Sequence, residues 1–111
     1  MDMVNIEPLS EMYETTNSYI ITVDLPFVKS KDQIEIYVKE NEIEIIAKAG
    51  QAVTWSSFEG FGKKMEFATF RKKITLPSKI NPDQVKATFK NGILIVELPK
   101  LLERRKKVEI E

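Results

Sequence analysis

One stretch near the C-terminus constrains the fold of this chain more than any other. Apolar and polar residues alternate there with the two-residue period of a half-buried strand, on either side of Asn91-Gly92. This dipeptide tolerates the positive φ angles of a type I′ turn, and Pro99 ends the second run because it has no backbone N–H to donate. The alternating apolar residues are Val85, Ala87, Phe89, Leu94, Val96 and Leu98. The stretch therefore predicts a β-hairpin, and Ile93 and Ile95 make its opposite face unusually apolar as well.

The same alternation recurs along most of the chain. It predicts a short edge strand at 12–15, longer strands at 19–25, 34–39, 43–49 and 65–76, and the hairpin at 85–98. Turn residues separate these stretches at nearly regular spacing, and no long helical pattern interrupts them. A set of about seven short strands is typical of an all-β, antiparallel β-sandwich of the immunoglobulin-like kind. The Cys–Trp–Cys framework of true immunoglobulin domains is absent.

Lys72 lies in the same phase as the inward apolar residues of its predicted strand, Phe70, Ile74 and Leu76. A lysine at such a position either extends its amine to the edge of the sheet or meets a carboxylate. We therefore expect an acidic partner for Lys72, or a route from its amine to solvent.

Residues 50–64 interrupt the alternation of apolar and polar residues. The segment contains three glycines and the aromatic residues Trp55, Phe58 and Phe61, and it is too long for an ordinary hairpin connection. Long loops inside a compact domain are usually functional. The sequence predicts a loop that either folds back over its own core or buries its aromatic side chains against a partner.

Charge and composition exclude several classes of function. Seventeen basic and seventeen acidic side chains cancel, which argues against bulk electrostatic binding of nucleic acid or of an anionic membrane. Without histidine or cysteine, the chain has no imidazole base, no thiolate nucleophile and no thiolate–imidazole zinc site. We expect one domain in 111 residues, with no enzymatic activity, cofactor or metal. The absence of cysteine, of a secretory leader and of a bilayer-length apolar run predicts a cytoplasmic protein.

Four short motifs, in order, resemble the small heat shock proteins, the α-crystallin family. The segment Ala87-Thr-Phe-Lys-Asn-Gly-Ile-Leu94 is similar to that family's A-x-x-x-N-G-V-L signature. Residues 19–48, with Asp-Leu-Pro at 24–26, are similar to its opening strands. Residues 70–77 fit F-x-R-x-[FY]-x-L-P, with Lys72 in place of the common arginine, and residues 108–110 fit the terminal I/V-x-I/V motif. Phe27 stands where the family usually has glycine, and the residues before the domain form a short leader in place of a longer apolar arm.

The resemblance implies an α-crystallin domain over residues 12–100, a short N-terminal leader at 1–11 and a C-terminal extension at 101–111. It implies an ATP-independent holdase chaperone of the stress response that binds unfolding client proteins and forms a homodimer and higher homo-oligomers. Residues 50–64 would then be a dimer-swapping loop. Val108 and Ile110 would dock in a groove of a neighbouring subunit, and the same groove would receive clients. The groove residues would be Ile34, Ile36, Val38, Val85, Ala87 and Phe89.

Two alternatives stay open at this point. A CS-type co-chaperone would share the fold and bind a large ATP-driven chaperone, although the terminal V-x-I motif and the aromatic loop argue against it. A β-sheet module for nucleic acid or carbohydrate would use Trp55, Phe58 and Phe61 as a stacking platform. The clusters of basic residues alternate with acids or lie in strands, which favours a solvated surface over a nucleic-acid site.

Overall fold

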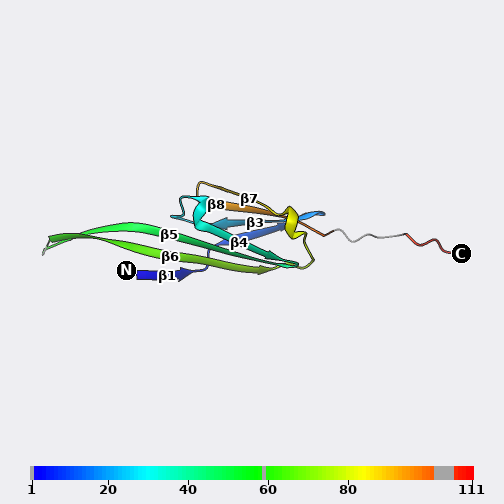
Figure 1. The fold of residues 1–111 in the computed structure, drawn as a ribbon, viewed down its shortest axis with the longest axis horizontal. Helices are drawn as coiled ribbons and strands as arrows, with labels where there is room; N and C mark the ends of the chain where they lie inside the picture. Colours follow the sequence, from blue (N-terminus) through cyan, green and yellow to red (C-terminus); the bar gives the residue numbers. More distant parts are fainter. Residues whose placement is uncertain (1, 59, 102–106) are drawn as a thin grey trace.

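The computed structural model describes residues 2–58, 60–101 and 107–111, and the side chains of 5–50, 58, 60–62, 67–101 and 107–111 within them. The described chain forms two four-stranded sheets that lie face to face (Figure 1). Sheet A has the order β1 (Asp2–Ile6), β6 (Gly60–Thr75), β5 (Glu42–Ser57), β4 (Ile34–Lys39). Sheet B has the order β2 (Ser10–Glu14), β3 (Ser18–Asp24), β8 (Ile93–Pro99), β7 (Lys86–Lys90). Two short 3-10 helices, η1 (Lys31–Gln33) and η2 (Pro82–Gln84), precede β4 and β7.

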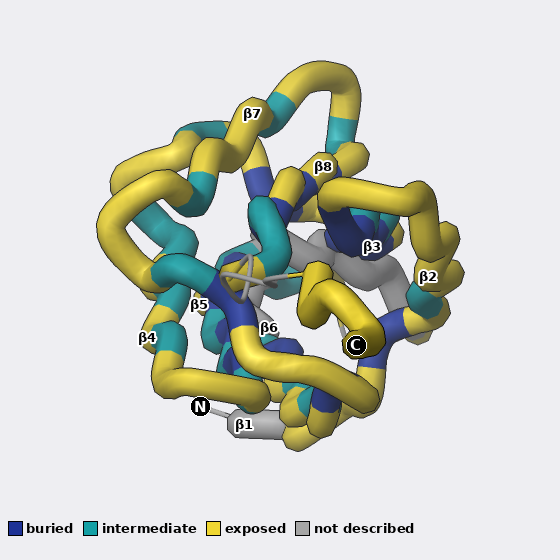
Figure 2. The backbone as a smooth tube through the Cα atoms, turned by 90° about the vertical axis from the view of Figure 1, so that its right-hand side faces the viewer, coloured by how far each residue is buried: buried dark blue, intermediate teal, exposed yellow. Residues whose placement is uncertain are grey.

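The alternating residues of both sheets meet in one core. Seen end-on in Figure 2, the buried positions lie between the two layers and the exposed ones on the outside. The buried apolar residues of the strands are Tyr19, Ile21, Val23, Ile43, Ile45, Ala47, Ala49, Phe70, Leu94, Val96 and Leu98. They are the inward residues of the predicted strands, so the β-sandwich inferred from the pattern is confirmed.

The hairpin between β7 and β8 forms as the sequence predicts. Asn91 and Gly92 both have positive φ, 53° and 77°, which a type I′ turn requires. The Leu25 amide donates a hydrogen bond to the Gly92 carbonyl at 2.8 Å and so fastens the turn to the end of β3. The two-residue connection sets the register in which Phe89 lies opposite Leu94.

Residues 50–57 and 60–64 form strand, so the prediction of a loop is wrong for these residues. β5 and β6 pair without a break from Glu42 opposite Thr75 to Ser57 opposite Gly60. The β4 ladder begins opposite Ala47 and the β1 ladder opposite Glu66, so residues 51–57 and 60–65 form a two-stranded arm that we call the ribbon. Glycine and serine weaken strand propensity, but each added pair in the ladder satisfies backbone groups in a register already set by the sandwich.

The N-terminal residues also contain a strand that the pattern did not reveal. β1 pairs in parallel with β6, from Asp2 opposite Glu66 to Ile6 opposite Phe70, and extends sheet A by one strand. Residues 10–14 form the expected edge strand, β2. Residues 102–106 of the predicted C-terminal extension lie outside the described ranges.

Lys72 has the acidic partner that its position requires. Its Nζ lies 2.6 Å from Glu7 Oε1, and the Lys72 side chain is 23% exposed. Glu7 follows β1 directly, and β1 lies beside β6 in sheet A. The carboxylate therefore reaches a lysine 65 residues further along the chain.

Among the described residues, no helix is long and apolar enough to cross a membrane.

Candidate docking sites

A small apolar groove lies between β4 and β7. These are the edge strands of the two sheets on the same side of the sandwich, and a hollow of about 110 Å³ separates them. Its lining residues are Lys31, Ile34, Ile36, Ala87, Thr88, Phe89 and Leu94. Four of the six predicted groove residues line this hollow, namely Ile34, Ile36, Ala87 and Phe89. Val38 and Val85 do not line it, although both pack against the core, as Ile34, Ile36 and Phe89 also do.

Edge position explains why this groove is apolar and open. The isoleucines of β4 point inward, but β4 has a neighbouring strand on one side within the described sheet, so Ile34 and Ile36 are only half-buried. The outer edges of β4 and β7 offer backbone donors and acceptors in the described structure, which is the usual template for an added strand.

Lys31 is a groove residue that the sequence analysis missed. It begins η1, whose first turn is held by a capping box between Ser30 and Gln33. The Ser-x-x-Gln spacing just before a strand was a readable signal for this turn. Lys31 adds a positive charge to a site that is otherwise mostly apolar.

The C-terminal motif lies away from this groove in the single chain. Val108 and Ile110 are 77% and 94% exposed, and residues 107–111 have no regular secondary structure. The C-terminal extension, which we call the tail, leaves one end of the sandwich, and the ribbon leaves the other (Figure 1). The structure therefore does not bring together the predicted motif and the predicted groove within one subunit.

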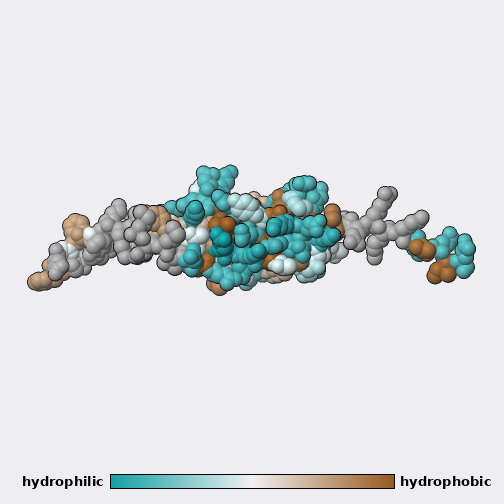
Figure 3. All heavy atoms as spheres, turned by 60° about the horizontal axis from the view of Figure 1, so that its bottom comes forward, coloured by the Kyte–Doolittle hydropathy of each residue, from teal (hydrophilic) through white to brown (hydrophobic). Residues whose placement is uncertain are grey.

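The end of the ribbon carries a second group of exposed apolar side chains. Phe58 is fully exposed and Phe61 is 86% exposed. In Figure 3, apolar side chains lie at both tips of the long axis, at the end of the ribbon and at the C-terminal residues, and further apolar patches lie over the sandwich. The backbone of Trp55 lies opposite Gly62 in the ribbon, and its side chain falls outside the described part of the structure.

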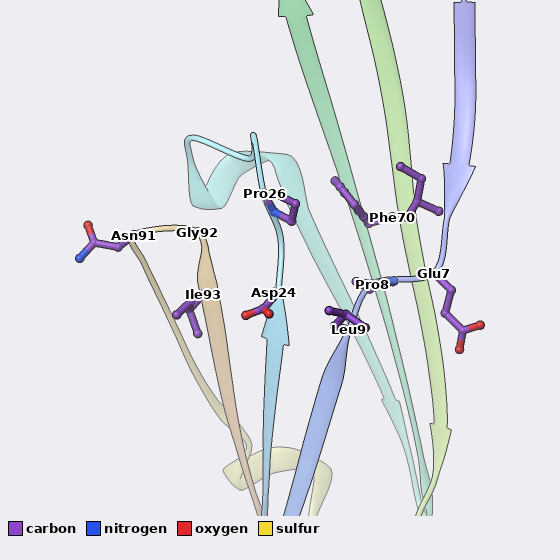
Figure 4. A pocket seen from close by; sticks show the side chains of 10 residues that line it. Glu7, Pro8, Leu9, Asp24, Pro26, Phe70, Asn91, Gly92 and Ile93 are labelled. Atoms are coloured by element: carbon purple, nitrogen blue, oxygen red, sulfur yellow. The ribbon is translucent and has the colours of Figure 1, made fainter.

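A hollow of about 420 Å³ lies where the β1–β2 connection meets the β7–β8 turn. Figure 4 shows Leu9, Pro26 and Phe70 around it, with Asp24 on one side and the Glu7 carboxylate pointing away. The Lys72 amine, through its hydrogen bond and its positive charge, lowers the pKa of Glu7 below its ordinary value. The two carboxylates do not face each other, so they do not form an acid–base pair.

The described residues contain no group of three or more histidine, cysteine, aspartate or glutamate side chains that could hold a metal ion. Every buried side-chain nitrogen or oxygen within the described ranges has a hydrogen-bond partner.

Comparison with known proteins identifies the same family that the motifs resemble. The sequence model of the Hsp20/alpha crystallin family matches residues 11–111. Spore protein SP21 of Stigmatella aurantiaca is 33% identical over 84% of this chain and 54% of its own length. Heat shock protein 16 of Schizosaccharomyces pombe is 30% identical over 95% of this chain and 74% of its own length. The chain thus spans about half of one relative and three quarters of the other.

Solved structures of proteins from the same family superpose on this chain. Heat shock protein 16.0 from Schizosaccharomyces pombe superposes with a TM-score of 0.69 at 26% identity, covering 96% of this chain and 76% of that one. The rat alpha crystallin domain superposes with a TM-score of 0.56 at 15% identity, covering 89% of this chain and 96% of that one, which supports the fold alone.

Proposed function

Because this chain belongs to the Hsp20/alpha crystallin family, we propose that it is an ATP-independent holdase, a small heat shock protein that binds unfolding proteins and prevents their aggregation. The observation that carries the proposal is the placement of large apolar side chains in water at both ends of the molecule, beyond a sandwich that is itself well packed. Exposed apolar surface of this kind marks interaction sites. Relatives named as heat shock proteins favour this function over a CS-type co-chaperone or a ligand-binding sheet.

The mechanism needs no covalent step. Unfolding proteins transiently expose apolar surface and unpaired strand edges, and these associate with one another. The groove between β4 and β7 offers both an apolar floor and open strand edges to such a segment. Contacts of this kind carry little side-chain selectivity, so we expect a broad range of clients.

The tail is proposed to occupy the same groove in a neighbouring subunit. Val108 and Ile110 are two residues apart, so in an extended segment both point to the same side. Lys31 in the groove would lie near the acidic residues that flank Ile110. Burying two such side chains contributes roughly 3–6 kcal/mol before ordering costs, so a single contact is weak and reversible. Several contacts in one assembly make it effective through multivalency.

The ribbon is proposed to form the homodimer by pairing with the sheet of a partner subunit. Its two strands extend past β4 and β1, and Phe58 and Phe61 near its end lie in water in the single chain. A strand from another chain would pair with the strands of the ribbon, and an apolar layer from that chain would cover Phe58 and Phe61. The cytoplasmic location expected from the sequence stays a prediction that cell fractionation tests.

An aggregation assay tests the function. Sub- to equimolar protein should suppress heat-induced light scattering of several unrelated clients in the absence of nucleotide. A matched amount of an inert protein of similar size serves as the control. A requirement for ATP, or no suppression across the set of clients, would refute the proposed activity.

A further inference from the structure

The backbone is fixed at the point where the tail leaves the sandwich. The Lys100 amide donates a hydrogen bond to the Asn17 carbonyl at 2.7 Å, and the Leu101 amide donates to the Lys79 carbonyl at 2.9 Å. Lys100 also forms an antiparallel bridge with Ile80, whose side chain is buried. The chain is therefore held from two sides, by the β2–β3 connection and by the connection that precedes η2, up to the first residue of the tail.

The Lys100 side chain adds to this hold. Its Nζ lies 3.2 Å from Glu14 Oε2 at the end of β2 and 5.0 Å from the centre of the Tyr19 ring. Tyr19 is itself buried, and its hydroxyl forms a hydrogen bond with the Ser78 hydroxyl. The Lys100 side chain is only 17% exposed, so its charge is attracted by the carboxylate and by the ring face with little competition from water. We call these side-chain contacts, together with the backbone hydrogen bonds of Lys100 and Leu101, the exit clamp.

The exit clamp places the start of the tail far from the groove of its own subunit. Of the β7 residues that line the groove, Ala87 is the nearest to the exit, and it lies opposite Val96 of β8, five residues before Leu101. At about 3.3 Å per residue, this offset along the strand is about 17 Å. A sideways step adds to the distance, because the tail follows β8 while the groove lies at the outer edge of sheet B.

The tail is too short to turn back over this distance from a fixed exit. Val108 lies seven residues after Leu101. A reversal of chain direction takes a turn of four residues. It therefore leaves about four residues, or about 13 Å, for the return along the sandwich. Val108 falls short of its own groove, and residues 107–111 lie beyond the end of the sandwich in the single chain (Figure 1).

Release of the exit clamp would change this outcome. With Lys100 and Leu101 free, the turn could begin at Pro99, which leaves about six residues, or about 20 Å, before Val108. The row of Val96 is only three residues back from Pro99, or about 10 Å. The tail would then reach the groove of its own subunit with chain to spare.

We propose that Lys100 is a positioning residue that directs the tail to the groove of a neighbouring subunit and away from its own. This role rests on the docking of Val108 and Ile110 put forward in the proposed function, and it adds the contact that directs them. A linked site has almost no effective concentration when the linker cannot span to it, and a high one when the linker can. With the clamp closed, each docked tail joins two subunits. With the clamp open, the same tail fills its own groove and joins nothing.

Cross-linking of the full chain tests this role, because the chain has no cysteine of its own. Glu109→Cys in the tail and Thr88→Cys in the groove are joined by a short bis-maleimide reagent. Both cysteines in one chain report docking within a subunit as covalently closed monomers. The two single-cysteine chains, when mixed, report docking between subunits as covalent dimers. With Lys100 intact, we expect cross-links almost entirely between chains.

Lys100→Glu places a second carboxylate beside Glu14 and should open the clamp. The cross-link within one chain should rise by about fivefold or more, and the assembly mass measured by light scattering should fall. Lys100→Met, which keeps the apolar stem and removes the charge, should act in the same direction, and it provides the test should Lys100→Glu fail to fold. Lys79→Glu is the matched control, because the Lys79 amine lies 3.9 Å from a Glu40 oxygen and its side chain is 63% exposed.

Charge exchange separates this pairing from a general loss of structure. Glu14→Lys combined with Lys100→Glu restores opposite charges and should return the cross-links toward the original ratio, with circular dichroism verifying the fold of every variant. An unchanged ratio in Lys100→Glu and Lys100→Met, or the same change in Lys79→Glu, would overturn the role of Lys100 and leave tail docking intact. No cross-link of either kind would overturn both. Client suppression by the same samples reports the chaperone activity separately from either result.

Discussion

Apolar side chains are buried inside the sandwich but exposed in the two segments that leave its ends. Inside the sandwich, Ile21 and Ile45 are completely buried because a second sheet covers them. At the ends, Phe58 and Ile110 are almost entirely in water. The ribbon has two strands and no second layer, and residues 107–111 have no sheet of their own. A two-stranded ribbon in water is marginal without a covering layer.

This difference separates stability from assembly. Substitutions in the sandwich should change the free energy of unfolding, while substitutions at the ends should change which chains associate. The outer face of sheet B lies between these extremes, because its isoleucines are half exposed on a well-folded sheet.

The largest effect on stability is expected from Ile45→Ala. Ile45 is fully buried between the sheets, and truncation of such a side chain lowers the free energy of unfolding by about 2–5 kcal/mol. Urea denaturation followed by circular dichroism measures the change. The control is Ile110→Ala, which should leave the midpoint unchanged. Similar losses in the two variants would contradict the separation of stability from assembly.

Removing the ribbon should abolish the dimer while the sandwich stays folded. Residues 52–62 are deleted and the gap is closed with a short glycine linker, so the four strands of sheet A keep their pairing near the core. Size-exclusion chromatography with light scattering should show monomers, and circular dichroism should remain β-rich. A shortened chain that stays dimeric at micromolar concentration would show that the ribbon is not the dimer element.

The tail variant Val108→Ala with Ile110→Ala should weaken higher assembly by about tenfold, since it removes most of the apolar surface available for docking. The fold and the dimer should be unaffected. Light scattering measures the assembly, and a labelled V-E-I peptide measures how accessible the groove becomes. Lys31→Glu in the groove gives a second perturbation of the same contact. Unchanged assembly mass and unchanged peptide binding would mean that the tail is only a solvated end.

Phe27→Gly should stabilise the sandwich by about 1 kcal/mol, a smaller effect than the core truncation. Phe27 has φ of 69°, a left-handed conformation that glycine adopts freely, and its side chain is exposed at the end of sheet B. The thermal midpoint measures the change. Phe27→Ala, which keeps a Cβ, is the control and should not gain as much. A lower midpoint for Phe27→Gly would show that the ring makes a stabilising contact.

The smallest effect concerns pH. The pKa of Glu7 is lowered by Lys72, so the ion pair contributes stability above the ordinary pKa of a glutamate and loses it as pH falls through the lowered value. Glu7→Gln should therefore make stability less sensitive to acid between neutral pH and strongly acidic solution. Both groups are partly in water, so the change is small. Denaturation midpoints at several pH values, compared between the two proteins, provide the test. A steeper loss in Glu7→Gln would contradict this sign.

Local pattern was sufficient for most of the sandwich. The alternation at 19–25, 34–39 and 85–98 predicted the inward faces of four strands, because side chains of a strand alternate between its two faces whatever the partner is. Asn91-Gly92 predicted its own turn, because the two residues tolerate positive φ without help from distant contacts. That Lys72 needs either a carboxylate or a route to solvent could also be read from its phase, since an unpaired charge on the inner face of a sheet is unfavourable.

Tertiary pairing decided the rest. The sequence called for a carboxylate near Lys72, but only the parallel pairing of β1 with β6 brings Glu7 there. The groove requires edge strands from two different sheets, and two of the six residues proposed for it, Val38 and Val85, lie outside its lining. Residues 50–57 and 60–64 form strand against their local composition because the register of β5 and β6, set within the sandwich, continues outward one hydrogen-bonded pair at a time. Side-chain alternation is local and therefore written in the sequence, whereas the partner of a strand edge depends on where the rest of the chain brings its backbone.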